Sequence, residues 1–242
     1  MVSIAMILLL GFVLGMRHAT DPDHVVAVTT IVTKQRGVGK AGLIGALWGL
    51  GHTVTVFAVG AAIILFGVAI PPRLGLSMEF AVACMLILLG VLNLTGALRR
   101  IQERFLGNSL APKANEMSRA NGRTGLVGDL GAFNVFRPLI IGIVHGLAGS
   151  AAVALLVMTT IRDPWWAICY LLLFGLGTVA GMILITALIA IPIVWSQRRF
   201  SSWNQGISVL SGLISLSFGF FLTYQITIVN GLFSNHPQWT PH

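Results

Sequence analysis

Charged side chains are scarce in this sequence. Only 9% of its 242 residues are Asp, Glu, Lys or Arg, and the acidic residues number seven. Soluble globular proteins carry about 25% charged residues, so the deficit excludes an ordinary soluble domain. Apolar residues make up 56% of the chain. This composition predicts an integral membrane protein of the all-α type.

Cysteines and the motifs of several enzyme classes are also few or missing. The two cysteines, Cys84 and Cys169, lie far apart within apolar runs, so we interpret them as packing residues and find no C-x-x-C metal motif. The sequence contains no Walker motif for ATP hydrolysis and no H-E-x-x-H motif of a metallopeptidase. We therefore expect that the chain does not hydrolyse ATP itself and is not an enzyme.

Apolar segments long enough to cross a membrane follow one another along the chain. They cover approximately residues 2–32, 42–70, 79–98, 138–161, 165–195 and 206–229, and so predict six transmembrane helices. The polar stretch 101–137 has charges of both signs and no sustained periodicity, which predicts a flexible linker. The chain is thus expected to form a single transmembrane domain (1–242) with a first half (1–100), the linker, a second half (138–229) and an exposed tail (230–242).

Basic residues are distributed unevenly between the expected loops. The loops after the first, third and fifth segments hold twelve Lys and Arg residues, whereas the other two loops hold two. Because Lys and Arg stay on the cytoplasmic side, we expect a multi-pass protein of the cell membrane with both termini outside and the 99–137 loop in the cytoplasm. The net charge of +8 then reflects topology and not nucleic-acid binding.

The two halves of the sequence resemble each other weakly. The segment GMRHATDPDHVVAV (15–28) aligns with GIVHGLAGSAAVAL (142–155), and GLGHTVTVF (49–57) aligns with GLGTVAGMI (175–183) at nearly the same offset. With three spans in each half, the second half must cross the membrane in the opposite sense. This predicts a 3+3 inverted repeat, whose substrate site would lie near the midplane where broken helices meet.

The segment GMRHATDPDHVVAVTT places several ionisable groups inside the first expected span. A charged residue at the centre of a membrane helix costs roughly 2.5–3.5 kcal/mol, so His18, Asp21, Asp23 and His24 are expected to be functional. Pro22 cannot donate a hydrogen bond to the carbonyl of His18 and should break the helix. The break would bring both imidazoles and a carboxylate to one ion, whereas a continuous helix would hold the two histidines about 240° apart.

Two further histidines lie within the expected spans. His52 belongs to the second segment and His145 to the fourth. His52 could bind a metal ion or hydrogen-bond to a neighbouring helix, whereas His145 could bind the ion, relay a proton or line the pathway. Imidazole and carboxylate ligands together suit a borderline divalent metal such as nickel, cobalt or zinc. The candidate metal ligands are His18, Asp21, Asp23, His24, His52 and His145.

These motifs carry a family resemblance. R-H-A-T-D-P-D-H resembles the R-H-A-x-x-x-D-H signature helix of the nickel/cobalt transporter family, and LGHTVTVF is similar to that family's second signature. The family's metal-recognition residues in the first signature correspond to His18, Asp23 and His24, and the second signature points to His52. HGLAGSAA (145–152) departs from the eight-helix members and resembles the shorter permeases associated with urease or hydrogenase maturation.

The resemblance implies a permease that imports Ni²⁺, with Co²⁺ as the second candidate substrate and no resident cofactor. Two alternatives stay open, namely a metal exporter of the same fold and a membrane-embedded metalloenzyme. The absence of histidine from residues 99–137 argues against the exporter. The expected partners are the divalent metal ion and the lipid bilayer. A homo-oligomer and a partner ATPase are left open, although no ATPase is required.

Overall fold

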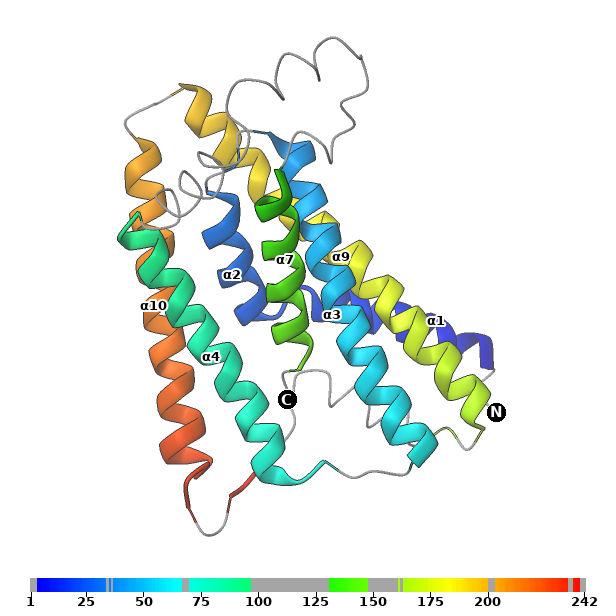
Figure 1. The fold of residues 1–242 in the computed structure, drawn as a ribbon. Coiled ribbons are helices and arrows are strands. Elements are labelled where there is room, and N and C mark those ends of the chain that lie inside the picture. Colours follow the sequence, from blue (N-terminus) through cyan, green and yellow to red (C-terminus); the bar gives the residue numbers. More distant parts are fainter. Residues whose placement is uncertain are drawn as a thin grey trace.

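Helices form the framework of the protein. The computed structural model describes residues 4–33, 35, 37–66, 70–96, 131–147, 161, 163–199, 203–234 and 237–239, and these residues contain no strand (Figure 1). The helices are α1 (Ile4–His18), α2 (Pro22–Val32), α3 (Val38–Phe66), α4 (Pro72–Leu94), α7 (Gly131–Gly146), α9 (Pro164–Arg199) and α10 (Trp203–Tyr224), which continues into the short π-helix η2 (Gln225–Val229).

The lengths of the helices match the six expected spans only in part. Four of them, α3, α4, α9 and α10 with η2, are long and apolar enough to cross a membrane, whereas α1, α2 and α7 are apolar but shorter. The first expected span is divided into α1 and α2. The described part of the fourth is α7, and residues 148–160 lie outside the described part of the chain. Six uninterrupted spans are therefore not observed.

Two expected boundaries differ from the structure. α7 begins at Gly131, so the last residues of the expected 101–137 linker are helical, and the rest of that linker lies outside the described residues. The C-terminal tail was expected to be exposed, and Phe233, Ser234 and Gln238 are, but other residues of the tail pack on α4. Leu232 is buried beside α4, and Trp239 donates a hydrogen bond from Nε1 to Oε1 of Glu79 (2.9 Å).

The outer surface is apolar and the interior holds polar groups. Large apolar side chains that are more than half exposed include Leu65, Phe66, Trp165, Phe220 and Phe221, whereas His24, His52 and His145 have no exposed surface. A soluble protein could not keep so many aromatic and aliphatic side chains in water while burying its imidazoles. The protein is a multi-pass helical membrane protein.

The first expected span is interrupted at Ala19–Asp21. Pro22 is the first residue of α2, a position where the missing N–H is not needed for the helix. Pro22 therefore starts a second helix and does not kink a continuous one. The carbonyl of His18, which the sequence predicted to be freed by the proline, accepts a hydrogen bond from the N–H of Asp21 (3.1 Å). α1 and α2 meet at this break at an angle near the centre of the helix array (Figure 1).

Packing between the helices has an approximate internal symmetry. α1 packs against α9, α7 packs against α3, α3 packs against α9, and α4 packs against α10. Exchanging α1 with α7, α3 with α9 and α4 with α10 leaves this set of pairs unchanged. The two halves of the described chain therefore use equivalent helices for equivalent contacts.

Close backbone contacts at glycines follow the same exchange. A Cβ on Gly15 would lie 2.1 Å from the carbonyl oxygen of Phe174, and a Cβ on Gly142 would lie 2.1 Å from that of Trp48. Gly15 and Gly142 are the first residues of one pair of aligned segments, 15–28 and 142–155. Trp48 and Phe174 directly precede the other pair, 49–57 and 175–183. Small residues at such positions let membrane helices approach closely.

The remaining helix pairs repeat this pattern. Equivalent approaches to a carbonyl oxygen occur at Gly177 with Phe12 (2.1 Å) and Gly51 with Leu139 (2.4 Å), and at Gly90 with Gly212 (2.9 Å) and Gly219 with Ala83 (3.1 Å). The last two contacts relate α4 to α10. The exchange thus extends from whole helices to individual residues.

A Gly→Ala substitution should lower stability at a close helix contact but not at a glycine with open space around it. Gly142→Ala puts a methyl group against the Trp48 backbone, so we expect the protein to lose about 1–3 kcal/mol of stability through overpacking. The matched control is Gly42→Ala in α3, where a Cβ would meet nothing within 4 Å and should be tolerated. Thermal unfolding in detergent measures both changes. Equal melting temperatures for the two variants would contradict the close contact.

Candidate metal site

Four histidines from four different helices meet at the break between α1 and α2. His18 is the last residue of α1, His24 lies in the first turn of α2, His52 in α3, and His145 at the end of α7. All four are buried, with His18 the most exposed at 6%. The ring centroids are 4.7 Å apart for His18 and His24, and 4.4 Å apart for His24 and His145. The structure therefore brings together histidines that are far apart in the sequence.

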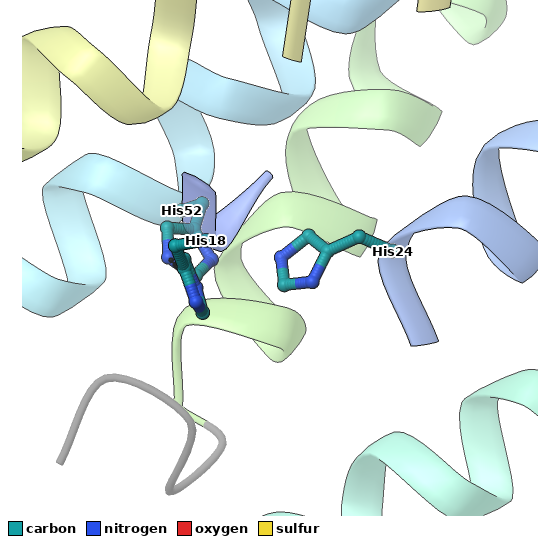
Figure 2. A group of neighbouring side chains, drawn as sticks. All are labelled: His18, His24 and His52. Atoms are coloured by element: carbon teal, nitrogen blue, oxygen red, sulfur yellow. Dashed lines mark hydrogen bonds between the residues drawn. The ribbon is translucent and has the colours of Figure 1, made fainter. Parts of the chain in front are cut away.

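Three of these imidazoles could surround one ion. His18 Nε2 lies 3.1 Å from His52 Nε2, and the ligand atoms of His18, His24 and His52 all lie within 4.8 Å of one another. In Figure 2 the ring of His24 extends from α2 toward the other two rings. His24 Nε2 is buried and has no hydrogen-bond partner among the described residues. It is the nitrogen through which His24 could bind an ion.

Both aspartates of the motif hold histidine rings in place. Asp21 Oδ2 lies 2.7 Å from His18 Nδ1, and Asp23 Oδ1 lies 3.1 Å from His24 Nδ1. A histidine that binds a metal typically donates its other ring N–H to a carboxylate, which fixes the tautomer and orients the ring. With Nδ1 donating to a carboxylate, Nε2 of His18 and of His24 keeps its lone pair for a ligand.

A second group overlaps the first. Asp23 Oδ2 lies 3.0 Å from His145 Nε2, and Asp23, His24 and His145 could also hold an ion. His24 belongs to both groups, so they form one continuous cluster. The Nδ1 atoms of His52 and His145 are buried and lack a hydrogen-bond partner among the described residues. Buried polar atoms without partners are costly, and a bound cation would offset part of that cost.

Aromatic side chains that the sequence analysis did not select form the walls of the cluster. Trp48 stacks on His24 with ring centroids 5.8 Å apart, and it also contacts His145. Phe174 lies against His18 at 5.7 Å. An aromatic residue within an apolar run carries no polar signal, although Trp48 lies only four residues before His52. These rings restrict the orientations that the imidazoles can adopt.

Comparison with known proteins identifies one clear relative. No family model matches the sequence, and no solved structure matches it. The urease accessory protein UreH of Bacillus sp. (strain TB-90) is 38% identical over 232 residues, which cover 96% of each chain. The chain belongs to the UreH family.

Membership of the UreH family confirms the resemblance to the urease-associated members of the nickel/cobalt transporters. UreH is an accessory protein and not an enzyme, so the expectation that this chain is not an enzyme is confirmed. The relative gives no support to the alternative of a membrane-embedded metalloenzyme. The relative's name is that of a urease accessory protein, and the apolar helices of this chain are those of a membrane protein.

Proposed function

We propose that this UreH-family protein is a permease that imports Ni²⁺ across the cell membrane, with Co²⁺ as a second substrate. The observation that carries the proposal is the group of three buried imidazoles at the helix break, whose ligand atoms lie within 4.8 Å of one another. Imidazole nitrogen suits nickel and cobalt better than magnesium or calcium. The metal ion is the substrate, and no resident cofactor is needed.

The charges around the imidazoles suit a divalent ion. Asp21 and Asp23 lie directly behind the imidazoles of His18 and His24 and supply two negative charges. A dication without such charges would meet a large desolvation penalty inside the membrane. We therefore assign the direct contacts to histidine nitrogens, and we assign to the aspartates the orientation of the rings and the neutralisation of the ion.

The overlap of the two groups offers a route for release. An ion held by His18, His24 and His52 could pass to Asp23, His24 and His145 without losing all its ligands, because His24 is shared. A transport site must bind its ion firmly enough to select it and weakly enough to release it. Stepwise exchange of ligands within one cluster meets both requirements.

The internal symmetry supports the expected inverted repeat. In this proposal α1 and α2 together form the first of six spans, and α7 begins the fourth. The equivalent glycine contacts of α1 on α9 and of α7 on α3 are those expected if a two-fold axis in the membrane plane relates the two halves. The metal cluster contains residues from both halves, since His145 comes from the second.

The driving force for import is the membrane potential. Moving a divalent cation inward gains roughly 4.6 kcal/mol per 100 mV, so no partner ATPase is required. This proposal uses the expected orientation, with both termini outside and the 99–137 loop in the cytoplasm. The start of α3, the end of α4 and the end of α9 lie at one end of the array (Figure 1). This agrees with the expected orientation, because these helix ends adjoin the loops that are expected in the cytoplasm.

Radioactive nickel uptake into liposomes that contain only this chain tests the proposal. His18→Ala, His24→Ala and His52→Ala should each abolish uptake, because each removes a nitrogen that contacts the ion. Asp21→Asn and Asp23→Asn should lower nickel affinity by about 10–100-fold, the usual effect of losing a group that orients a metal ligand. Asp163→Asn, at an exposed carboxylate before α9, is the control. Transport by all three histidine variants at the parent rate would refute the site.

Labelling with a membrane-impermeant thiol reagent tests the orientation. In a background of Cys84→Ala and Cys169→Ala, the Ser109→Cys and Ser234→Cys variants should label from opposite sides of the membrane. Intact cells should show labelling at position 234 only, because the basic 99–137 loop is cytoplasmic. Labelling at position 109 from outside would reverse the orientation and, with it, the direction of import.

A further inference from the structure

A cavity of about 280 Å³ lies beside the metal cluster, between α2, α4 and α10 with η2. Its polar lining comprises Asp21, Asp23, Glu79, Gln225 and Asn230. Six water molecules fill about 180 Å³ at their liquid volume of ~30 Å³ each, so the cavity has room for a hydrated divalent cation. We call this cavity the access chamber.

Two carboxylates link the access chamber to the histidines. Asp21 and Asp23 line the chamber and also bond to His18, His24 and His145. The side chain of Asp21 is 38% exposed and that of Asp23 is 16% exposed, while the histidines behind them are buried. An ion in the chamber would therefore meet the carboxylates before it meets the imidazoles.

The position of the chamber along the bundle identifies the side to which it leads. Glu79 lies near the start of α4, and Gln225 and Asn230 lie just beyond the end of α10. These helix ends lie at the lower end of Figure 1, together with the end of α3. In the proposed orientation this is the outer face of the membrane, since residues 67–71 between α3 and α4 contain no Lys or Arg and the first turn of α4 contains only Arg73.

We infer that the access chamber is the route by which a hydrated divalent cation reaches the histidines from outside, and that Glu79 is its first ligand. The inference rests on the proposed function. Three carboxylates line one cavity whose other walls are largely apolar. Negative charges in such a low-dielectric surrounding concentrate cations and raise their rate of association. The oxygens of Gln225 and Asn230 can replace water molecules as the ion loses its hydration shell. Trp239 fixes Glu79 at the rim through its hydrogen bond.

Stopped-flow nickel binding to the purified protein tests the role of Glu79. Tryptophan fluorescence is a suitable signal, because Trp48 stacks on His24. Glu79→Gln keeps an oxygen that can accept the Trp239 N–H, but it removes the charge. We expect its association rate constant to fall by about tenfold, near the lower end of the effect of electrostatic focusing. Asp163→Asn removes an exposed charge outside the chamber and should bind nickel at the parent rate.

The possible results separate the two proposals. A parent protein that does not bind nickel would refute the proposed function itself. A parent protein that binds nickel, with an unchanged association rate in Glu79→Gln, would refute only the access chamber.

A second test changes the chamber after the protein has folded. Gln225→Cys, in the background of Cys84→Ala and Cys169→Ala, can be modified with a cationic or an anionic methanethiosulfonate of similar size. The cationic adduct should slow nickel association more than the anionic one, because it opposes the charge of the three carboxylates. Identical association rates for the unmodified and both modified proteins would contradict the inference.

The internal symmetry independently indicates where the ion leaves. The exchange of α4 with α10 pairs Ala83 with Gly212 and Gly90 with Gly219. Glu79 precedes Ala83 by four residues and Ser208 precedes Gly212 by four, so these two positions are equivalent. The same alignment of α4 with α10 makes Leu222, which lines the access chamber, equivalent to Asn93. The counterpart of the chamber is thus centred on Asn93 and Ser208, at the opposite ends of α4 and α10.

Hydrogen bonds join α4 to α10 among the described residues of this counterpart. Asn93 Nδ2 donates to the carbonyl oxygen of Ser208 (2.8 Å) and to Ser211 Oγ (3.0 Å), and Ser208 Oγ donates to Asn93 Oδ1 (3.0 Å). Asn93 and Ser211 are buried. We propose that this cluster is the inner gate, which separates to release the ion into the cytoplasm when the outer chamber closes.

A reversible crosslink tests the inner gate. A Cβ on Gly212 would lie 3.4 Å from Cβ of Asn93, close to the roughly 3.5–4.5 Å that a disulfide requires. The Asn93→Cys, Gly212→Cys pair, without Cys84 and Cys169, should bind nickel when oxidised but show no uptake until it is reduced. Each single variant is the control for the crosslink. Uptake by the oxidised pair at its reduced rate, or loss of nickel binding upon oxidation, would contradict the gate.

Discussion

The desolvation of imidazole groups inside the membrane is the constraint on which the arrangement depends. Four buried histidines cannot hydrogen-bond to water, so each needs a partner supplied by the protein or by an ion. The break at Ala19–Asp21 provides these partners, because it turns His18 and His24 toward each other and places one aspartate against each ring. His24 Nε2 has no hydrogen-bond partner among the described residues, and Nε2 of His18 and of His52 contact only each other. These three nitrogens are the ones available to a metal ion.

Close helix packing keeps this cluster together. The contacts at Gly15, Gly51 and Gly142 bring α1, α3, α7 and α9 near enough for short side chains to meet from several helices. Apolar side chains of the same helices face outward, where lipid and not water surrounds them. The polar interior and the apolar exterior therefore have one cause. The lipid around the protein cannot hydrogen-bond to polar groups, so these groups lie inside and apolar side chains lie outside.

The approximate two-fold exchange links the site to a mechanism of transport. Equivalent helices make equivalent contacts in the two halves, but the two ends of α4 and α10 differ in this structure. One end borders a cavity that Glu79 lines, and at the other the hydrogen bonds of Asn93 join α4 to α10. Two similar halves that differ at their ends are what alternating access across a membrane requires.

The sequence by itself determined the helical membrane class, the family signature and the polar motif around Pro22, because hydropathy and ionisable residues within apolar runs are local signals. It was also correct that the proline interrupts the first span, though not that it frees the carbonyl of His18. Only the tertiary structure decided that Asp21 and Asp23 pair with imidazoles, that Trp48 and Phe174 wall the cluster, and that Trp239 reaches Glu79. Apart from the pairs of Asp21 with His18 and of Asp23 with His24, which are close in the sequence, these contacts join residues that are far apart along the chain, and no periodicity encodes such distances. The packing of helices against one another sets them.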